Sequence, residues 1–159
     1  VLELASRAGG YVEYGQLAAE LGIGVGEQAP IARIREAVLA LRRSKGMVLD
    51  AADHDTWSAG SFFTNPIVQD DSSIPLECPR YPAAGGVKLS AAWLIEQAGI
   101  TRGFEVAPGA RVSTKHVLAL TNAGGATAAA VEELAGVIRR RVRERFGVDL
   151  LAEPRILSP

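Results

Sequence analysis

Apolar residues recur every three to four positions in three stretches of the chain, at about 31–44, 89–98 and 127–146. This spacing places side chains on one face of a helix, so each stretch predicts a helix with one buried side. Pro30 favours a helix start before the first stretch, and Thr127 is a good N-cap for the last. The residues predicted to face the core are Ile31, Ile34, Val38 and Leu41 in the first helix, Ala91, Leu94, Ile95 and Ala98 in the second, and Val131, Leu134, Ile138 and Val142 in the third.

Shorter segments predict the sheet and one more helix. Tyr14 to Leu21 has the apolar spacing of a short helix, and Gly22 supplies the left-handed residue that ends it. Four further segments have the apolar pattern of β-strands. Together these elements predict an α+β fold, in which a mixed or antiparallel sheet is covered by the three longer helices. The predicted strands are 1–6, 57–68, 111–121 and 148–151, with a turn at 7–10 and an irregular segment at 69–82.

The segment 57–68 combines strand-forming residues with polar side chains. Ser61 and Asn65 alternate with apolar residues and are predicted to share one rim of the strand, while Gly60 allows a backbone or a ligand to approach closely. Such a pattern is more often an ordinary strand beside a turn than a site. The residues predicted to face the core are Phe62 and Ile67.

Composition places the chain among globular proteins. Its 159 residues form one domain, or one domain with an appendage, and can bury roughly 70% of the unfolded surface. A hydrophobic content of 48% with a net charge of -1 favours neither nucleic acid nor a membrane as partner, and we expect a monomer. The basic stretch 139–145 lacks the aromatic cluster that would accompany base recognition.

The cysteine and histidine content excludes disulfide-bonded and zinc-binding proteins. Cys78 is the single cysteine, so an internal disulfide is impossible and a reducing, cytoplasmic compartment fits best. The two histidines are far apart and give no zinc-ligand spacing. No apolar run reaches the roughly 20 residues of a membrane helix, and no signal peptide opens the chain. The chain starts at Val1 as if cut from something longer.

Two local patterns are interpreted as structural. The Gly-rich segment 22–26 closes a helix, whereas a phosphate-binding loop follows a strand and opens a helix. Asp53, His54 and Asp55 fall in a polar loop, where such residues cap and turn more often than they react. We therefore predict neither a nucleotide cradle nor a catalytic pair there.

Four residues remain open between a structural and a binding role. Lys45 ends a basic helix face that is either solvated or in reach of a phosphate, and Tyr81, held extended by Pro82, either packs or stacks on a ligand. Lys88 precedes the predicted helix start, an unfavourable place for a cation unless an anion lies nearby. His116 is either a hydrogen-bonded structural residue or a ligand contact.

The sequence Gly-Ser-Phe-Phe-x-Asn-Pro at 60–66 resembles the motif of the UDP-N-acetylenolpyruvoylglucosamine reductase (UDP-N-acetylmuramate dehydrogenase) family. The resemblance extends over nearly the whole chain, although the segment 69–82 departs from the family's short helix. At the C-terminal end, Arg155 stands where many members carry a second glutamate. The further matching segments are 45–50, Tyr81-Pro82, 87–99, 113–122 and 153–155.

The resemblance implies a flavoenzyme that reduces UDP-N-acetylglucosamine enolpyruvate to UDP-N-acetylmuramate, with FAD and NADPH, for peptidoglycan synthesis. It implies Ser61 as the proton donor and Glu153 as a second catalytic residue. It also implies that an N-terminal flavin-binding domain of the same polypeptide precedes this substrate-binding domain, spanning 1–159, which alone would be inactive. The implied substrate contacts are Lys45, Gly60, Asn65, Tyr81, Lys88, Arg102 and His116.

Two alternatives stay open from the sequence. The first is a stand-alone nucleotide-sugar binding or regulatory module without catalysis. The second is a purely structural protein, which would bind no UDP-sugar under any condition.

Overall fold

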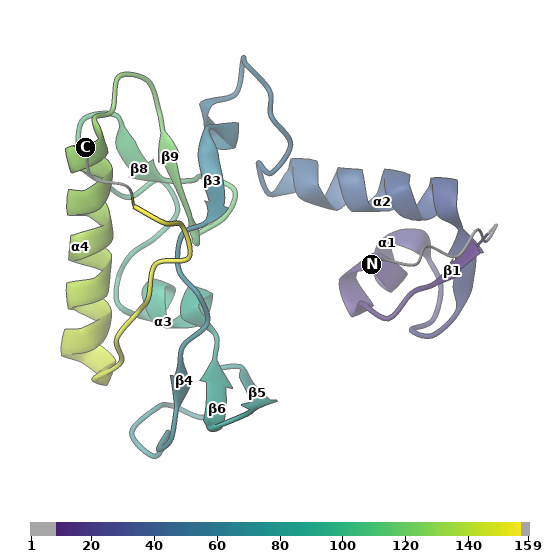
Figure 1. The fold of residues 1–159 in the computed structure, drawn as a ribbon, viewed down its shortest axis with the longest axis horizontal. Coiled ribbons are helices and arrows are strands. Elements are labelled where there is room, and N and C mark those ends of the chain that lie inside the picture. The colour runs from purple at the N-terminus through teal and green to yellow at the C-terminus, as the bar shows by residue number, and fades with distance from the viewer. Residues whose placement is uncertain (1–8, 157–159) are drawn as a thin grey trace. The chain divides into compact units, whose positions relative to one another are not determined.

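The structure, a computed structural model, describes residues 9–156 and divides at residue 48 into two units, which are considered separately (Figure 1). In the first unit, β1 (Gly9–Tyr11) pairs with β2 (Gln28–Pro30) in antiparallel fashion. The helices are α1 (Gly15–Leu21) and α2 (Ile31–Ser44). Gly22 ends α1 with φ 69°, as predicted. The predicted strand 1–6 lies outside the described residues.

Two expectations for the first unit need correction. Gly9 and Gly10 belong to a strand and not to a turn, because their backbones pair with Ala29 and Pro30. The apolar stripe of α2 is only partly covered within this unit, where Ile31 is 50% exposed and Ala37 is the buried residue of the helix. The small core of this unit consists of Val12, Ala18, Leu21, Ala29 and Ala37.

The second unit contains two antiparallel sheets. The four-stranded sheet has the order β3-β9-β8-β7, with β3 (Ser58–Ser61), β7 (Glu105–Ala107), β8 (Ala110–Val112) and β9 (Ala119–Asn122). The three-stranded sheet has the order β4-β6-β5, with β4 (Ile67–Val68), β5 (Arg80–Ala83) and β6 (Gly86–Leu89). Every strand pair in the described chain is antiparallel, so the fold is α+β as predicted.

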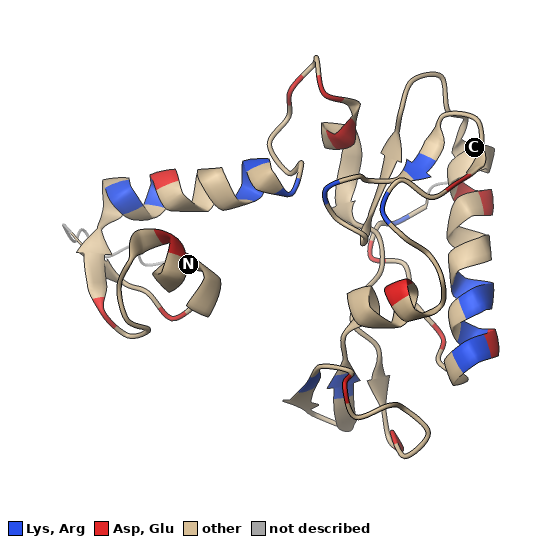
Figure 2. Cartoon of the chain, turned by 180° about the vertical axis from the view of Figure 1, so that it is seen from behind, with Lys and Arg blue, Asp and Glu red and all other residues tan. Residues whose placement is uncertain are grey.

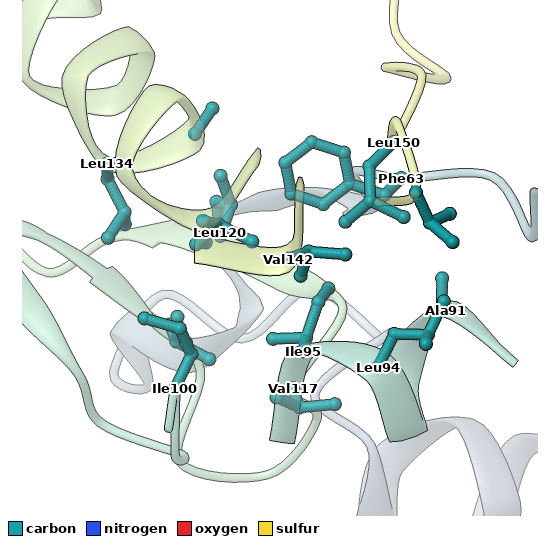
Figure 3. Packing of buried hydrophobic residues seen from close by; sticks show 14 of the residues in the cluster. Phe63, Ala91, Leu94, Ile95, Ile100, Val117, Leu120, Leu134, Val142 and Leu150 are labelled. Atoms are coloured by element: carbon teal, nitrogen blue, oxygen red, sulfur yellow. The ribbon is translucent and has the colours of Figure 1, made fainter. Parts of the chain in front are cut away.

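Helices cover the four-stranded sheet and enclose the core of this unit. The long helix α4 (Ala128–Phe146) packs against β7, β8 and β9, and the short helix α3 (Ala91–Gln97) packs against α4 (Figure 1). Thr127 accepts the Ala130 N–H at 3.2 Å, which confirms the predicted N-cap. A 3-10 turn, η1 (His54–Thr56), precedes β3. The fully buried side chains between these layers include Phe63, Leu94, Ile95, Leu134, Val142 and Leu150 (Figure 3).

The predicted strand 57–68 is wrong as a single element, because it divides between the two sheets. β3 ends at Ser61 and β4 begins at Ile67. The expected inward residues differ too: Phe63 is buried at 2% exposure, Phe62 is half-buried, and Ile67 is 52% exposed. The break arises because the backbone between the two strands bonds to other segments, described below.

Three further boundaries differ from expectation. The segment 111–121 is a hairpin of β8 and β9, because the Ser113 hydroxyl accepts backbone N–H groups and turns the chain. The second predicted helix starts at Ala91 behind its N-cap Ser90. The stretch 148–151 forms no strand, although Val148 and Leu150 are buried.

Candidate functional site

The two predicted catalytic residues come from segments that the fold brings side by side. Ser61 is half-buried at the end of β3, where it pairs with Ala119. The next residue, Phe62, accepts the Glu153 backbone N–H at 2.9 Å, and Thr64 N–H donates to Leu151 at 3.0 Å. With the Phe63–Ala152 bridge, these bonds fasten the C-terminal segment antiparallel to the chain after Ser61. The Glu153 side chain is exposed.

Gly60 shapes the strand that carries Ser61. Its φ of 82° lies in the left-handed region that favours glycine, and the pairing of β3 with β9 shifts register between Ser58 and Ser61. Its N–H donates to the Ser58 hydroxyl at 3.2 Å. The glycine is therefore needed for the bulge that directs the backbone at Ser61.

The three-stranded sheet aligns two of the predicted substrate contacts. Lys88 of β6 lies opposite Tyr81 of β5 on one side and Ile67 of β4 on the other. Directly opposed residues in antiparallel strands point to the same face, so a cation is flanked there by an aromatic and an aliphatic side chain. Tyr81 is 47% exposed and Lys88 is half-buried.

Asn65 connects this sheet with α3. Its Oδ1 accepts the N–H of Ala91, the first residue of α3, at 2.9 Å. The side-chain carbonyl thus satisfies one of the helix's unpaired amide groups. Asn65, which the resemblance implies as a substrate contact, therefore also makes a hydrogen bond that supports the fold.

Arg80 orders the loop before Tyr81, a role that sequence reasoning missed. Its guanidinium donates to Asp71 Oδ2 at 2.6 Å and to four backbone carbonyls of the same loop. The predicted irregular conformation of 69–82 is confirmed up to β5, which begins at Arg80. The sequence feature that could have indicated this role is the position of the arginine directly before Tyr81, an expected ligand contact. The four carbonyls belong to Ile74, Pro75, Leu76 and Cys78.

His116 lies in the turn between β8 and β9, together with Lys115. The Ser113 hydroxyl accepts the N–H groups of Lys115 at 3.0 Å and of His116 at 3.2 Å. Lys115 forms an ion pair with Asp53, and this hydrogen bond lowers the pKa of the Asp53 carboxyl and raises the pKa of Lys115. Both partners of the pair are partly exposed.

Two further predicted contacts are described by their own surroundings. Lys45 belongs to the first unit, at the end of α2, where its ammonium group donates to Gln16 Oε1 at 3.0 Å. Arg102 is exposed in the turn that follows α3. Apart from Lys45, all the predicted contacts belong to the second unit.

A groove lies on α4 next to the place where the C-terminal segment pairs with the chain after Ser61. It has a volume of about 330 Å³ and contacts Phe62 and Ala152, the flanks of the paired segment. Figure 2 shows basic residues gathered toward the C-terminal end of α4, where a second hollow is lined by Arg139, Arg140 and Arg143. Arg143 also lies 3.6 Å from Asp149.

Residues 9–156 include no group of three or more histidine, cysteine or acidic side chains that could hold a metal ion. Within the same range no helix has the length and apolar character needed to cross a membrane.

Comparison with known proteins gives consistent matches. The family model for the C-terminal domain of UDP-N-acetylenolpyruvoylglucosamine reductase matches residues 51–157. The protein of that name from Mycobacterium avium is 55% identical over 92% of this chain and 43% of its own length. The Nocardia farcinica protein of the same name is 56% identical over 90% of this chain and 41% of its own length.

A solved structure shows a weaker likeness. The UDP-N-acetylenolpyruvylglucosamine reductase of Thermus caldophilus is 25% identical, covers 83% of this chain and 44% of its own, and has a TM-score of 0.41. The chain thus spans less than half the length of the curated relatives named above.

Proposed function

The chain belongs to the UDP-N-acetylenolpyruvoylglucosamine reductase family, and we propose that it is the substrate-binding and proton-donating part of such a reductase. The reaction would convert UDP-N-acetylglucosamine enolpyruvate to UDP-N-acetylmuramate, a precursor of peptidoglycan, with FAD and NADPH. The cytoplasm is the proposed location. There the lone Cys78 stays free, and its burial raises the pKa of the thiol and keeps it unreactive.

The Gly-rich segment 22–26 does not have the arrangement of a phosphate-binding loop for the flavin. The Gly-rich turn at 22–26 follows α1 and leads into β2, so it lacks the helix N-terminus on which a phosphate cradle depends. We therefore assign FAD to a flavin-binding domain in the remainder of the polypeptide and derive no step through it.

The pairing of the C-terminal segment with the chain after Ser61 carries the proposal. A serine hydroxyl is a weak acid, and it can protonate a substrate carbon only when it is held within hydrogen-bond reach and water is excluded. The bulge at Gly60 and the register with Ala119 fix Ser61, and the bond to Phe62 fixes the backbone of Glu153. In the proposed reaction Ser61 Oγ gives its proton to the carbon that becomes the new stereocentre, and Glu153 assists at the enolate.

The resemblance to the family implies the proposed substrate contacts, and their charge and shape suit a nucleotide sugar. Lys88 suits the diphosphate, and Tyr81 offers a ring face to the sugar or the uracil, since the two side chains are neighbours on one sheet face. Asn65 and His116 supply polar contacts from adjoining segments. The proposed set is completed by Lys45, Gly60 and Arg102.

Ser61→Ala in the full-length protein tests this function. The variant should bind substrate and accept electrons from NADPH at the parent rate, while reoxidation by the enolpyruvyl substrate slows by about 10²–10⁴-fold. Ser73→Ala, which alters an exposed serine outside β3, is the matched control and should leave both rates unchanged. Parent-like reoxidation in Ser61→Ala would remove Ser61 from the mechanism.

A further inference from the structure

A buried carboxylate lies under the turn that carries His116. The Asp55 side chain is only 5% exposed, and its Oδ1 accepts the Thr114 backbone N–H at 3.1 Å. Its Oδ2 accepts the Thr114 hydroxyl. A buried carboxylate is costly unless it is hydrogen-bonded, so these bonds fix the turn firmly to η1.

A second buried polar side chain shapes the same turn from within. Ser113 has no exposed surface, and its hydroxyl accepts the N–H groups of both Lys115 and His116. From outside, Asp53 forms the ion pair with Lys115. The turn 113–116 is thus held by two carboxylates of the segment 53–55 as well as by its own serine.

The turn is joined directly to the strand of Ser61. Ala119, the register partner of Ser61, donates its N–H to the His116 carbonyl at 3.0 Å and accepts the Ser113 N–H at 2.8 Å. Phe62 N–H donates to Leu118 at 2.7 Å. Any shift of the turn would therefore be passed to the backbone beside Ser61.

We propose that Asp55 is a positioning residue for substrate binding, because it holds the turn 113–116 so that His116 stands at the sugar nucleotide next to Ser61. The proposal rests on the function proposed above. Arg111 supports the carboxylate electrostatically, since its Nη2 lies 3.9 Å from Asp55 Oδ1. Asp55 itself touches no substrate in this scheme and acts through Thr114.

The test uses the full-length enzyme with a matched pair of variants. Thr114→Val removes the hydroxyl that donates to Asp55 and keeps the shape of the side chain, whereas Thr114→Ser retains the hydroxyl. We expect Thr114→Val to raise the KM for the UDP-sugar about tenfold, the effect of one lost hydrogen bond, with flavin reduction by NADPH unchanged. Thr114→Ser should keep the parent KM, as should Asp149→Asn, which alters an exposed carboxylate.

A second comparison separates positioning from mere stability. In a His116→Ala background, Thr114→Val should add no further rise in KM, because both changes remove the same contact. Asp55→Asn should raise KM at least as much as Thr114→Val, and circular dichroism should show parent-like folding of the threonine variants.

Three results would overturn the inference. The first is a parent-like KM in folded Thr114→Val, and the second is an equal rise in Thr114→Ser. The third is a full additional rise in the His116→Ala background. If the parent enzyme itself fails to oxidise NADPH with the enolpyruvyl sugar, the proposed function is wrong and the inference falls with it.

Discussion

The backbone N–H of Glu153 donates a hydrogen bond of 2.9 Å to the carbonyl oxygen of Phe62. The place of Glu153 is therefore set by main-chain pairing, while its side chain remains exposed in this chain. Exclusion of water around that carboxyl would need bound substrate or another part of the polypeptide. Because the backbone of Glu153 is held by this hydrogen bond and its side chain is exposed, the side chain can be replaced without disturbing the pairing.

Glu153→Gln should leave stability nearly unchanged and slow the substrate-driven reoxidation of the flavin in the full-length enzyme. The amide keeps the shape but loses the proton that a carboxyl can exchange, so a slowing of about 10²-fold or more is expected. Stopped-flow reoxidation measures the rate. Glu133→Gln, at an exposed glutamate of α4, is the control, and equal rates in both variants would make Glu153 a surface residue.

Lys88→Met should weaken binding of the UDP-sugar by about 1–3 kcal/mol, because a charge-assisted hydrogen bond to the diphosphate is lost. Isothermal titration of the full-length protein measures this. Lys45→Met, from the first unit, is predicted to act in the same direction. Parent affinity in either variant would assign that lysine to a solvated surface.

Asn65→Asp should separate the two roles of Asn65. The carboxylate can still accept the Ala91 N–H, so the melting temperature should stay near the parent value. Substrate affinity should fall, since a donor is lost and a negative charge meets the diphosphate. Asn65→Ala should lose about 1 kcal/mol of stability as well. Unchanged affinity in Asn65→Asp would leave only the structural role.

Gly86→Ala should destabilise the second unit far more than Gly85→Ala. A Cβ at Gly86 would lie 2.1 Å from the Val68 carbonyl oxygen, so β4 and β6 would have to separate. Gly85 also has positive φ, 85°, but a Cβ there meets open space. We expect about 1 kcal/mol for Gly85→Ala and at least about 2 kcal/mol more for Gly86→Ala, measured by urea unfolding. Similar losses in the two variants would show that the close approach of the Val68 carbonyl is not the cause.

Asp53→Asn should lower the melting temperature at neutral pH by a small amount that disappears at both pH extremes. Lys115 lowers the pKa of Asp53, so this carboxyl adds stability above its ordinary value of 3.8 and loses it as the pH falls through the folded-state pKa. The raised pKa of Lys115 adds stability below its ordinary value of 10.5, which is lost as the pH rises through the folded-state pKa.

Melting curves across this pH range check the prediction. Lys115→Met should reproduce the loss, and the double variant should be no less stable than either single one. A difference that persists well below pH 3.8 would point to an effect other than the ion pair.

Helices were more predictable from the sequence than the sheets. The range of α2 and the cap of α4 follow from local spacing and from Thr127, which need no knowledge of distant residues. The division of 57–68 depends on bonds from Phe62 and Thr64 to the end of the chain, and no alternation of side chains reveals such partners. The hairpin at 111–121 depends on the Ser113 hydroxyl, which competes with strand pairing.

The candidate site was predictable only in part, for a related reason. The resemblance to the family implies Ser61 and Glu153 as catalytic residues, and the structure adds that their segments are paired. Asp55 and Arg80 look like ordinary loop residues in the sequence, because their partners are a turn far along the chain and a set of backbone carbonyls. Carbonyl acceptors have no residue type, so sequence patterns cannot mark them.

The pairing of Thr64 with Leu151 also bears on how the protein is made. These residues are 87 positions apart, so the second unit cannot close while its last segment is still inside the ribosome. Until then Phe63 lacks the neighbouring Leu150 of the finished core, and an apolar surface stays open on the nascent chain. Folding of this unit should therefore be slow for its size, because a contact between residues so far apart in the sequence has to form before the core is complete.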